Sequence, residues 1–191
     1  SDSLWNYEVG MKARWFDGIL DTKVSLYFLK WEDMQHQVVR TSDAGSFITN
    51  AGAAESKGLE VELRALPTAN LEVGLNFSIS DARMTELTAA QAALTGFKLG
   101  ESEKLTNPEF EASAFVQYTT PVFDGNELYL RTDIQYVDGY YNKGLFVPGK
   151  PGVIDAGAEK SDAYHNVNVS MGLTSQNWTA ALYGENVLDN D

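Results

Sequence analysis

Residues 59–65 alternate strictly between apolar and charged side chains, a pattern that fits very few folds. The apolar positions are Leu59, Val61, Leu63 and Ala65, and the charged positions between them are Glu60, Glu62 and Arg64. Because successive side chains of a β-strand point to opposite faces, this segment is predicted to be a strand with one apolar and one charged face. A soluble core accepts charges only when they are paired, whereas lipid on one side and water on the other accept both faces. The alternation therefore favours a strand of a membrane β-barrel.

The segment from Leu4 to Phe16 has the same period of two and supplies a length scale. Trp5 and Trp15 share its apolar face and are ten residues apart, which is about 33 Å of strand at ~3.3 Å per residue. With a tilt of about 40°, this length spans about 25 Å, the height of the apolar band between the aromatic girdles of an outer-membrane barrel. Comparable patterns predict about eight long strands, at residues 4–16, 20–40, 50–66, 71–84, 109–119, 128–136, 166–173 and 178–182.

The connections between these segments alternate in length. Four short turns are expected, near Asp17, Pro67, Pro121 and Gln176. The connections between those turns run from short to long, at residues 41–45, 85–107 and 139–162. Outer-membrane meander barrels have short periplasmic turns and longer extracellular loops. The predicted fold class is therefore all-β: an antiparallel up-and-down meander of about eight long strands, part of a transmembrane β-barrel. A capping-box pattern adds a short helix in one extracellular loop, at residues 88–94.

Composition argues against several other classes of protein. The chain has 191 residues, with 27 acidic and 14 basic side chains and a formal net charge of −13, whereas nucleic-acid binders present clustered Lys and Arg. Cysteine is absent, so neither disulfides nor cysteine metal sites are expected. No apolar run approaches the roughly 18 residues of a transmembrane helix. No signal peptide opens the chain at Ser1, so a mature product or a fragment is expected.

Motifs that would carry catalysis or metal binding are weak. The run from Gly144 to Pro151 nearly matches a phosphate-binding loop, but a proline stands where that loop needs Ser or Thr. The two histidines, His36 and His165, fall on different predicted strands, and His165 is expected at the membrane boundary. No cofactor, metal site or catalytic residue is predicted. A solvated, charge-paired wall is expected instead at five inward positions, Glu60, Glu62, Arg64, Arg131 and Asp133.

Four stretches of the chain carry a family resemblance. The most specific runs from Phe47 to Gly52 and continues from Ser56 to Glu62, and it looks like a recognisable barrel segment. Leu4 to Lys12 looks like a strand opening, and Leu105 to Pro108 looks like a return from an extracellular loop. Tyr183 to Asp189 looks like the segment ahead of a final strand. Together they resemble the TonB-dependent outer-membrane receptors, specifically the C-terminal third of their barrel, over the whole chain.

The resemblance implies a receptor for energy-coupled uptake of a scarce ligand, such as a ferric siderophore, in the bacterial outer membrane. It implies transport and no enzymatic activity. The partners would be outer-membrane lipid, the small-molecule ligand and the TonB complex, the last through parts of the receptor absent from this chain. Residues 1–191 are expected to be the C-terminal portion of the barrel, without the plug domain and the final strand.

Ligand contacts are predicted at the outer rim, where the long loops of such a barrel lie. Three are aromatic side chains of the last long connection and two are basic side chains near the rim: Tyr140, Tyr141, Phe146, Arg40 and Arg83. The identity of the ligand stays open among iron siderophores, haem, cobalamin, sugars and copper.

Two alternatives use the same strands. Eight strands suffice for a small closed barrel, which would serve as an anchor, an adhesin or an outer-membrane enzyme. A soluble all-β binding module or hydrolase would instead turn the apolar faces inward. A sheet cut out of a larger barrel has two unpaired edges, which are templates for association. Such a chain is expected to close on itself or to pair its edge strands with a second copy.

Overall fold

The structure is a computed structural model that describes residues 2–39, 46–87, 103–104, 107–123, 125–140 and 160–190. Nine strands and one 3-10 turn are present in this part of the chain. The strands are β1 (Ser3–Trp15), β2 (Leu20–Val39), β3 (Ser46–Thr68), β4 (Leu71–Leu87), β5 (Glu103–Lys104), β6 (Phe110–Pro121), β7 (Glu127–Val137), β8 (Tyr164–Thr174) and β9 (Thr179–Gly184). The 3-10 turn η1 (Phe16–Gly18) joins β1 to β2.

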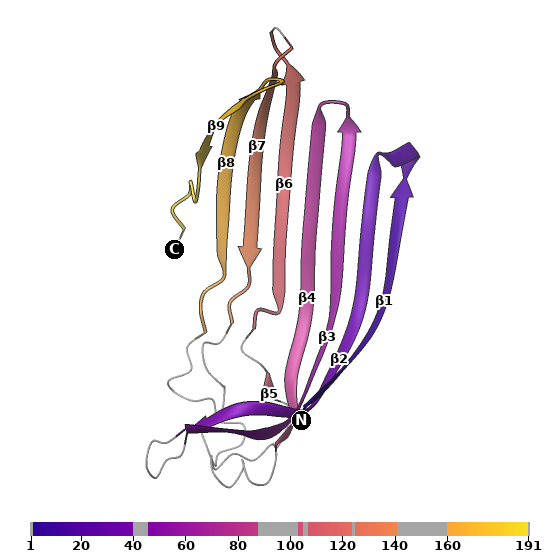
Figure 1. Ribbon diagram of the computed structural model, residues 1–191, viewed down its shortest axis with the longest axis vertical. Coiled ribbons are helices and arrows are strands. Elements are labelled where there is room, and N and C mark those ends of the chain that lie inside the picture. The colour runs from indigo at the N-terminus through magenta and orange to yellow at the C-terminus, as the bar shows by residue number, and fades with distance from the viewer. Residues whose placement is uncertain are drawn as a thin grey trace.

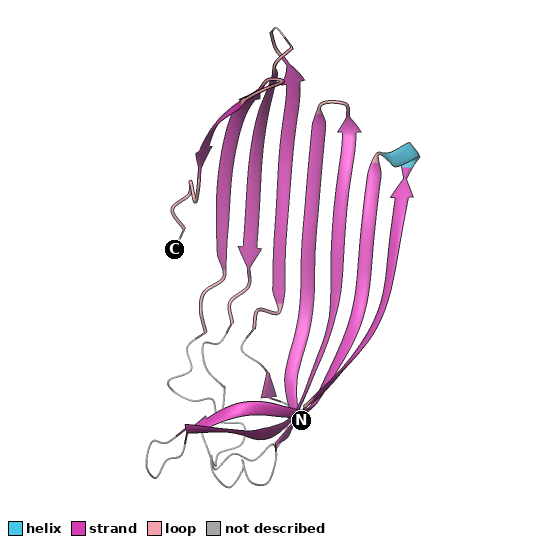
Figure 2. Cartoon of the chain, in the orientation of Figure 1, coloured by secondary structure: helices cyan, strands magenta, loops and turns pink. Residues whose placement is uncertain are grey.

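All strands belong to one antiparallel sheet in which chain order is also spatial order (Figure 1). The order is β1-β2-β3-β4-β6-β7-β8-β9, and the two-residue β5 pairs with β4. This confirms the predicted meander of eight long strands. The helix predicted at residues 88–94 lies outside the described residues, among which η1 is the sole helical element (Figure 2). No helix of the described chain is long and apolar enough to cross a membrane.

The two ends of the sheet differ in the length of their connections. Tight turns at residues 16–19, 69–70, 122–126 and 175–178 gather at one end, which we call the short-turn end. The connections after β2, β4 and β7 leave from the opposite end, the long-connection end (Figure 1). The alternation of connection lengths predicted from the sequence is therefore confirmed.

The sheet does not close within the described residues. β1 pairs only with β2, and β9 pairs only with β8, so these two strands are the edges. The alternative of a self-contained closed barrel of eight strands is therefore wrong for this chain, and so is the expectation that the chain closes on itself. Pairing of the two edges with a second copy stays a prediction.

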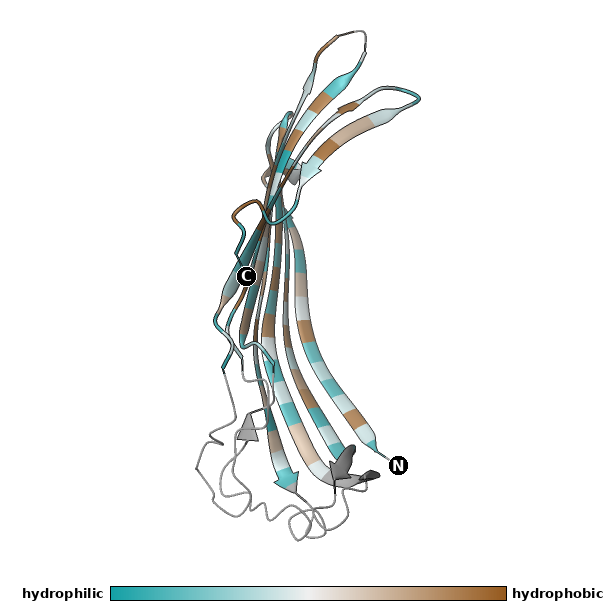
Figure 3. Ribbon diagram, turned by 90° about the vertical axis from the view of Figure 1, so that its left-hand side faces the viewer, coloured by the Kyte–Doolittle hydropathy of each residue, from teal (hydrophilic) through white to brown (hydrophobic). Residues whose placement is uncertain are grey.

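Because the strands pair in register, the alternation of apolar and polar side chains continues from strand to strand across the whole sheet. Directly paired residues share a face in an antiparallel sheet, so a row of partners shows what each face presents. One apolar row runs from β1 to β7 through Met11, Val24, Val61, Phe77, Ala112 and Tyr136. The neighbouring polar row runs through Lys12, Lys23, Glu62, Asn76, Ser113 and Gln135. Figure 3 shows the resulting bands of alternating hydropathy along the strands. We call the two sides the apolar face and the polar face.

The apolar face is uncovered. Val9 is 68% exposed, Leu75 is 38% exposed and Val169 is 40% exposed. The buried hydrophobic side chains of the described residues are few, namely Met34, Ala53, Ala54 and Val137. A soluble module would bury its apolar face against a second layer, so that alternative does not fit this structure. Lipid is the environment in which an uncovered apolar sheet face is stable.

Candidate functional site

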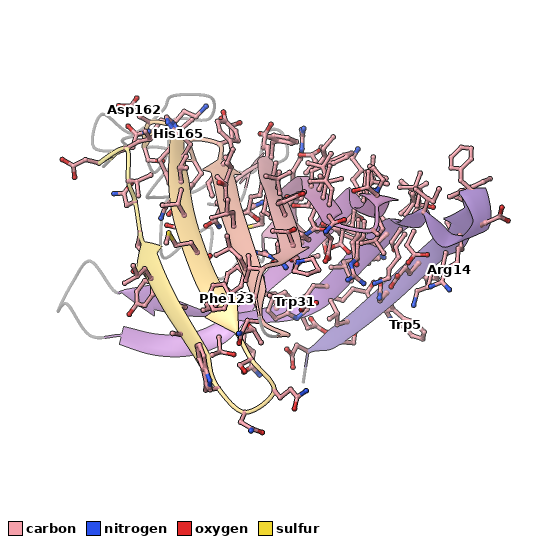
Figure 4. The ribbon with its side chains drawn as sticks, turned by 90° about the horizontal axis from the view of Figure 1, so that it is seen from above. Trp5, Arg14, Trp31, Phe123, Asp162 and His165 are labelled. Carbon is pink, nitrogen blue, oxygen red and sulfur yellow. The ribbon has the colours of Figure 1, made fainter. Side chains whose placement is uncertain are left out.

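The polar face is the hollowed side of the sheet. A shallow cavity of about 680 Å³ is lined by polar side chains from six strands. Viewed along the strands, side chains project from both sides of the single layer (Figure 4). The polar lining comprises Glu8, Lys12, Lys23, Ser25, Glu60, Glu62, Asn76, Ser78, Glu111, Ser113 and Gln135.

Ion pairs tie neighbouring strands together across this face. Lys23 Nζ lies 2.8 Å from Glu62 Oε1, which joins β2 to β3. Arg64 Nε lies 2.7 Å from Glu72 Oε1, which joins β3 to β4. The charge-paired wall predicted from the sequence is thus present at Glu62 and Arg64. A third pair, Arg14 Nε to Asp21 Oδ1 at 2.7 Å, joins β1 to β2 near the short-turn end.

Arg131 on β7 has the most elaborate surroundings of these cations. Its Nη2 lies 2.6 Å from Asp133 Oδ1, and its Nη1 donates to Gln117 Oε1 at 3.3 Å. The guanidinium also lies over the ring of Phe115, 4.0 Å from the ring centroid. The positive charge is therefore held by a carboxylate, an amide and an aromatic ring together. Arg131 and Asp133 thus form the pair expected of the predicted wall, whereas Glu60, the fifth predicted position, has no ion pair among the described residues.

Some charges of the polar face have no ionic partner among the described residues. Glu60 and Glu111 occupy one row on either side of Ser78, and neither forms an ion pair within this part of the chain. Lys12 on β1 is paired in register with Lys23 on β2. Glu62 forms an ion pair with Lys23 and not with Lys12. The described residues contain no group of three metal-ligating side chains that could hold a metal ion. The polar face thus offers a hydrophilic, partly charge-paired surface.

Three aromatic rings on the polar face lie flat over glycines of the neighbouring strand. A Cβ added to Gly58 would be 2.5 Å from Tyr27, one added to Gly74 would be 2.2 Å from Phe115, and one added to Gly172 would be 2.3 Å from Tyr129. Each ring and its glycine are direct partners in register. We call these the ring–glycine contacts. They keep large rings against the wall instead of in the hollow.

These contacts were not predicted, although the sequence contains part of the signal for them. Tyr27, Phe115 and Tyr129 are aromatic residues at polar-face positions, which is unusual for a charged wall. Their glycine partners become visible only when the register between strands is known. Glycine weakens a strand unless something packs over it, and a cross-strand aromatic ring does so.

The β2–β3 hairpin bends where it leaves the rest of the sheet at the long-connection end (Figure 1). Register shifts occur between Trp31 and Met34, and again between Met34 and Gln35. Asp33 has φ of 53°, and Gly52 on the opposite strand has φ of 136°. Irregularities of this kind bend a strand and increase its twist. The bulge lies just beyond the stretch from Tyr27 to Trp31, where the alternation of apolar and polar residues fails.

A small buried cluster occupies the bend. Met34 on β2 and Ala54 on β3 are 7% and 4% exposed, and Met84 on β4 packs against them. Small side chains suit this crowded part of the strand, and Ala53 and Ala54 are buried. The bend is therefore held by packing as well as by backbone conformation.

The predicted ligand contacts are placed only in part. Arg83 lies in register with Glu55 on the apolar side of β4, and its Nε is 2.7 Å from Asp81 Oδ1. Tyr140 lies just after β7 and is 36% exposed. Its amide donates to Ser161 Oγ at 3.1 Å, and the Ser161 amide donates to the Tyr140 carbonyl at 2.9 Å. Three candidates, Arg40, Tyr141 and Phe146, lie outside the residues that the structure describes.

Arg83 and Tyr140, the two candidates within the described residues, lie in different parts of the sheet, near the end of β4 and just after β7. The Arg83 side chain lies on the apolar side of β4. Tyr140 lies at the start of the β7–β8 connection, and two hydrogen bonds link its backbone to Ser161 at the other end of that connection. The remaining histidine of interest, His165, lies in the apolar row after Tyr136. Its Nδ1 is 2.6 Å from Asn190 Nδ2, so it packs against the end of the chain. No catalytic arrangement surrounds it among the described residues.

Comparison with known proteins identifies the fold. Residues 3–187 match the family described as "TonB dependent receptor-like, beta-barrel". The structure resembles the ferric yersiniabactin uptake receptor FyuA from Yersinia pestis, with a TM-score of 0.69 at 17% identity. The likeness covers 98% of this chain and 25% of the FyuA chain, so the chain spans about a quarter of the length of that receptor. An open sheet with an apolar outer side and a hollow polar side is what one sector of such a barrel looks like. The chain belongs to the TonB-dependent receptor β-barrel family.

Proposed function

We propose that this chain is part of the barrel of an outer-membrane receptor that takes up a scarce ligand with energy delivered through the TonB complex. The observation that carries the proposal is the family match over residues 3–187. The sheet supports it physically, because its apolar face suits lipid and its hollow polar face suits a water-filled interior. The role is transport, with no catalytic step assigned to the chain.

The proposal places the chain in the C-terminal portion of the receptor. The plug domain, the final strand and the contacts with the TonB complex would then belong to parts of the receptor beyond residues 1–191. The unpaired edges of β1 and β9 would continue into neighbouring strands of the full barrel. The short-turn end would face the periplasm, and the long-connection end would face outside.

A ferric siderophore is the ligand that we propose. FyuA, the neighbour in fold, is named for uptake of ferric yersiniabactin. Tyr140 supports a contact role, because two hydrogen bonds to Ser161 fix its backbone at the outer end. Arg40, Tyr141 and Phe146 remain proposed contacts from their sequence positions. Arg83 also remains a proposed contact from its sequence position, and its side chain lies on the apolar side of β4.

Uptake by the full-length receptor tests this function. A strain that lacks the receptor gene should lose growth on the matching ferric siderophore as its sole iron source, and the intact gene should restore it only when TonB is functional. The variant Tyr140→Ala should weaken siderophore binding, whereas Phe123→Ala, an exposed aromatic change at the short-turn end, should not. Normal growth of the deletion strain on every ferric siderophore offered would remove the proposed ligand class.

A further inference from the structure

The two ends of the β7–β8 connection meet at Tyr140 and Ser161, beyond the paired part of the two strands. The last register pair of β7 and β8 is Val137 with Tyr164. Tyr140 and Ser161 each lie three residues beyond that pair, which is up to about 10 Å of extended chain at ~3.3 Å per residue. The Ser161 amide donates to the Tyr140 carbonyl at 2.9 Å, and the Tyr140 amide donates to Ser161 Oγ at 3.1 Å.

The Ser161 hydroxyl takes the place of a backbone acceptor in this pair. In a regular hydrogen-bonded pair of antiparallel strands, the amide of each residue donates to the carbonyl of the other. The Ser161 amide follows this rule, whereas the Tyr140 amide donates to the Ser161 side chain. The same hydroxyl also donates to the Tyr140 carbonyl at 3.2 Å. The Ser161 side chain therefore contacts both polar groups of the Tyr140 backbone, and alanine at this position would remove both contacts.

Gly139 makes the close approach of Ser161 possible. A Cβ added to Gly139 would overlap the carbonyl oxygen of Ser161. The backbone also turns at this point, because the Asp138 amide donates to the Phe110 carbonyl on β6 at 2.9 Å. Amides two residues apart in a regular strand point to the same side, yet the Tyr140 amide points to Ser161 on the β8 side. A residue with a side chain at position 139 would therefore push Ser161 away from Tyr140.

This arrangement fixes the backbone of Tyr140 and leaves its side chain accessible. Tyr140 is 36% exposed, whereas Gly139 is buried. A tyrosine ring offers a large apolar surface and one hydroxyl group to a ligand, and a fixed backbone lowers the entropy that is lost on binding. We propose that Ser161 and Gly139 are positioning residues that hold Tyr140 in place for contact with the ferric siderophore. The inference rests on the proposed function, in which Tyr140 is a ligand contact.

Amide hydrogen exchange of the full-length receptor tests the positioning without any ligand. Measured by mass spectrometry in detergent micelles, exchange of the Tyr140 amide should become about tenfold faster in Ser161→Ala, because this amide loses its acceptor. Ser161→Thr keeps a hydroxyl group and should restore slow exchange. The control is Ser175→Ala at the short-turn end, where the Ser175 amide donates to the Trp178 carbonyl, and it should change nothing at Tyr140. Unchanged exchange of the Tyr140 amide in Ser161→Ala would overturn the proposal.

Affinity for the siderophore shows whether Ser161 acts through Tyr140. The probe is the ferric siderophore that supports growth through the intact receptor. Ser161→Ala should weaken its binding about two- to tenfold, the equivalent of one hydrogen bond, and Ser161→Thr should restore it. In a receptor that already carries Tyr140→Ala, Ser161→Ala should weaken binding no further. A full additional loss in this double variant would show that Ser161 does not act through Tyr140, and the proposal would fail.

Gly139→Ala is an independent variant of the same arrangement. It should speed exchange of both the Tyr140 and the Ser161 amides and weaken siderophore binding at least as much as Ser161→Ala does. Both residues lie outside β7 and β8, so unfolding in urea should match that of the unchanged receptor. If Gly139→Ala fails to fold, the two Ser161 variants decide the outcome. A receptor that binds no siderophore, but in which Ser161→Ala speeds exchange at Tyr140, would contradict the proposed function and leave the positioning of Tyr140 standing.

Discussion

The two faces of this sheet differ in what their side chains contact. On the polar face, Arg131 contacts Asp133, Gln117 and Phe115, and three rings cover three glycines. On the apolar face, Val9 and Leu182 remain 68% and 69% exposed. Hydrophobic burial is the main favourable contribution to folding, so the chain alone leaves a large part of that contribution unused. The polar face is organised by contacts within the chain, whereas the apolar face has no second layer over it among the described residues.

A charge placed on the apolar face should have the largest effect on stability. Leu75 and Asn76 are neighbours on β4 with opposite orientations, so they form a matched pair of sites. In lipid vesicles, Leu75→Arg in the full-length receptor should lower the free energy of unfolding by about 2–4 kcal/mol. Asn76→Arg should change it much less, because that side chain points to the hollow.

Urea unfolding followed by tryptophan fluorescence measures both variants of this pair. Detergents and bilayers of different thickness should alter the cost of Leu75→Arg and leave that of Asn76→Arg nearly constant. Equal costs for the two variants would mean that the apolar face does not meet lipid, and the contrast between the faces would fail.

Loss of a ring–glycine contact should have the next largest effect. In Gly74→Ala the new Cβ would meet the Phe115 ring at 2.2 Å, so the ring must rotate away and release Arg131. Forced movement of a packed side chain costs about 1–3 kcal/mol, which unfolding in vesicles would detect. Gly10→Ala is the control, because its nearest neighbour would be Val24 O at 3.3 Å and no ring lies over it.

A double variant separates the ring from the backbone in this effect. Gly74→Ala combined with Phe115→Ala should cost less than the sum of the two single changes, because the steric conflict is then absent. Additive costs would show that the glycine serves the backbone and that the ring–glycine contact contributes nothing of its own.

The sequence predicted best which side of the sheet each side chain lies on. A period of two fixes which residues share a side of a strand, so the wall pairs of Glu62, Arg64 and Arg131 followed from it. The same rule, extended along β4 from Ile79 through Asp81, already placed Arg83 on the apolar side. The ligand role predicted for Arg83 rests on its nearness to the rim, which alternation within the strand does not address.

Contacts between strands were beyond the reach of the sequence. The pairing of Phe115 with Gly74 depends on register, which alternation within a single strand does not specify. The bend at Asp33 and Gly52 depends on two strands shifting together, and each residue alone resembles an ordinary turn residue. Whether the two edge strands pair with each other was also beyond the sequence, because strand number alone does not show whether a sheet closes.

Removal of Arg131, the cation that Asp133 and Phe115 contact on the polar face, should have a moderate effect on stability. Arg131→Gln should lower the free energy of unfolding by about 1 kcal/mol, since both a cation–π contact and an ion pair are lost. Arg14→Gln is the comparison, because the Arg14 side chain is 71% exposed and its pair with Asp21 is open to solvent. Added salt should weaken the contribution of Arg14 more than that of Arg131. A larger loss of stability in Arg14→Gln than in Arg131→Gln would show that the contact of Arg131 with Phe115 does not stabilise the protein.

The smallest predicted change in stability comes from Lys12. It tests whether the charges of the polar face are balanced within the chain. Lys12 faces Lys23 across two strands, and like charges in direct opposition are unfavourable. Lys12→Glu should therefore raise the free energy of unfolding by about 0.2–1 kcal/mol, and added salt should reduce this gain. Lys12→Gln, which only removes the repulsion, should give a smaller gain. A loss of stability in Lys12→Glu would mean that Lys12 contacts an anionic group elsewhere in the receptor. The polar face, like the apolar one, would then depend on a partner from outside this chain.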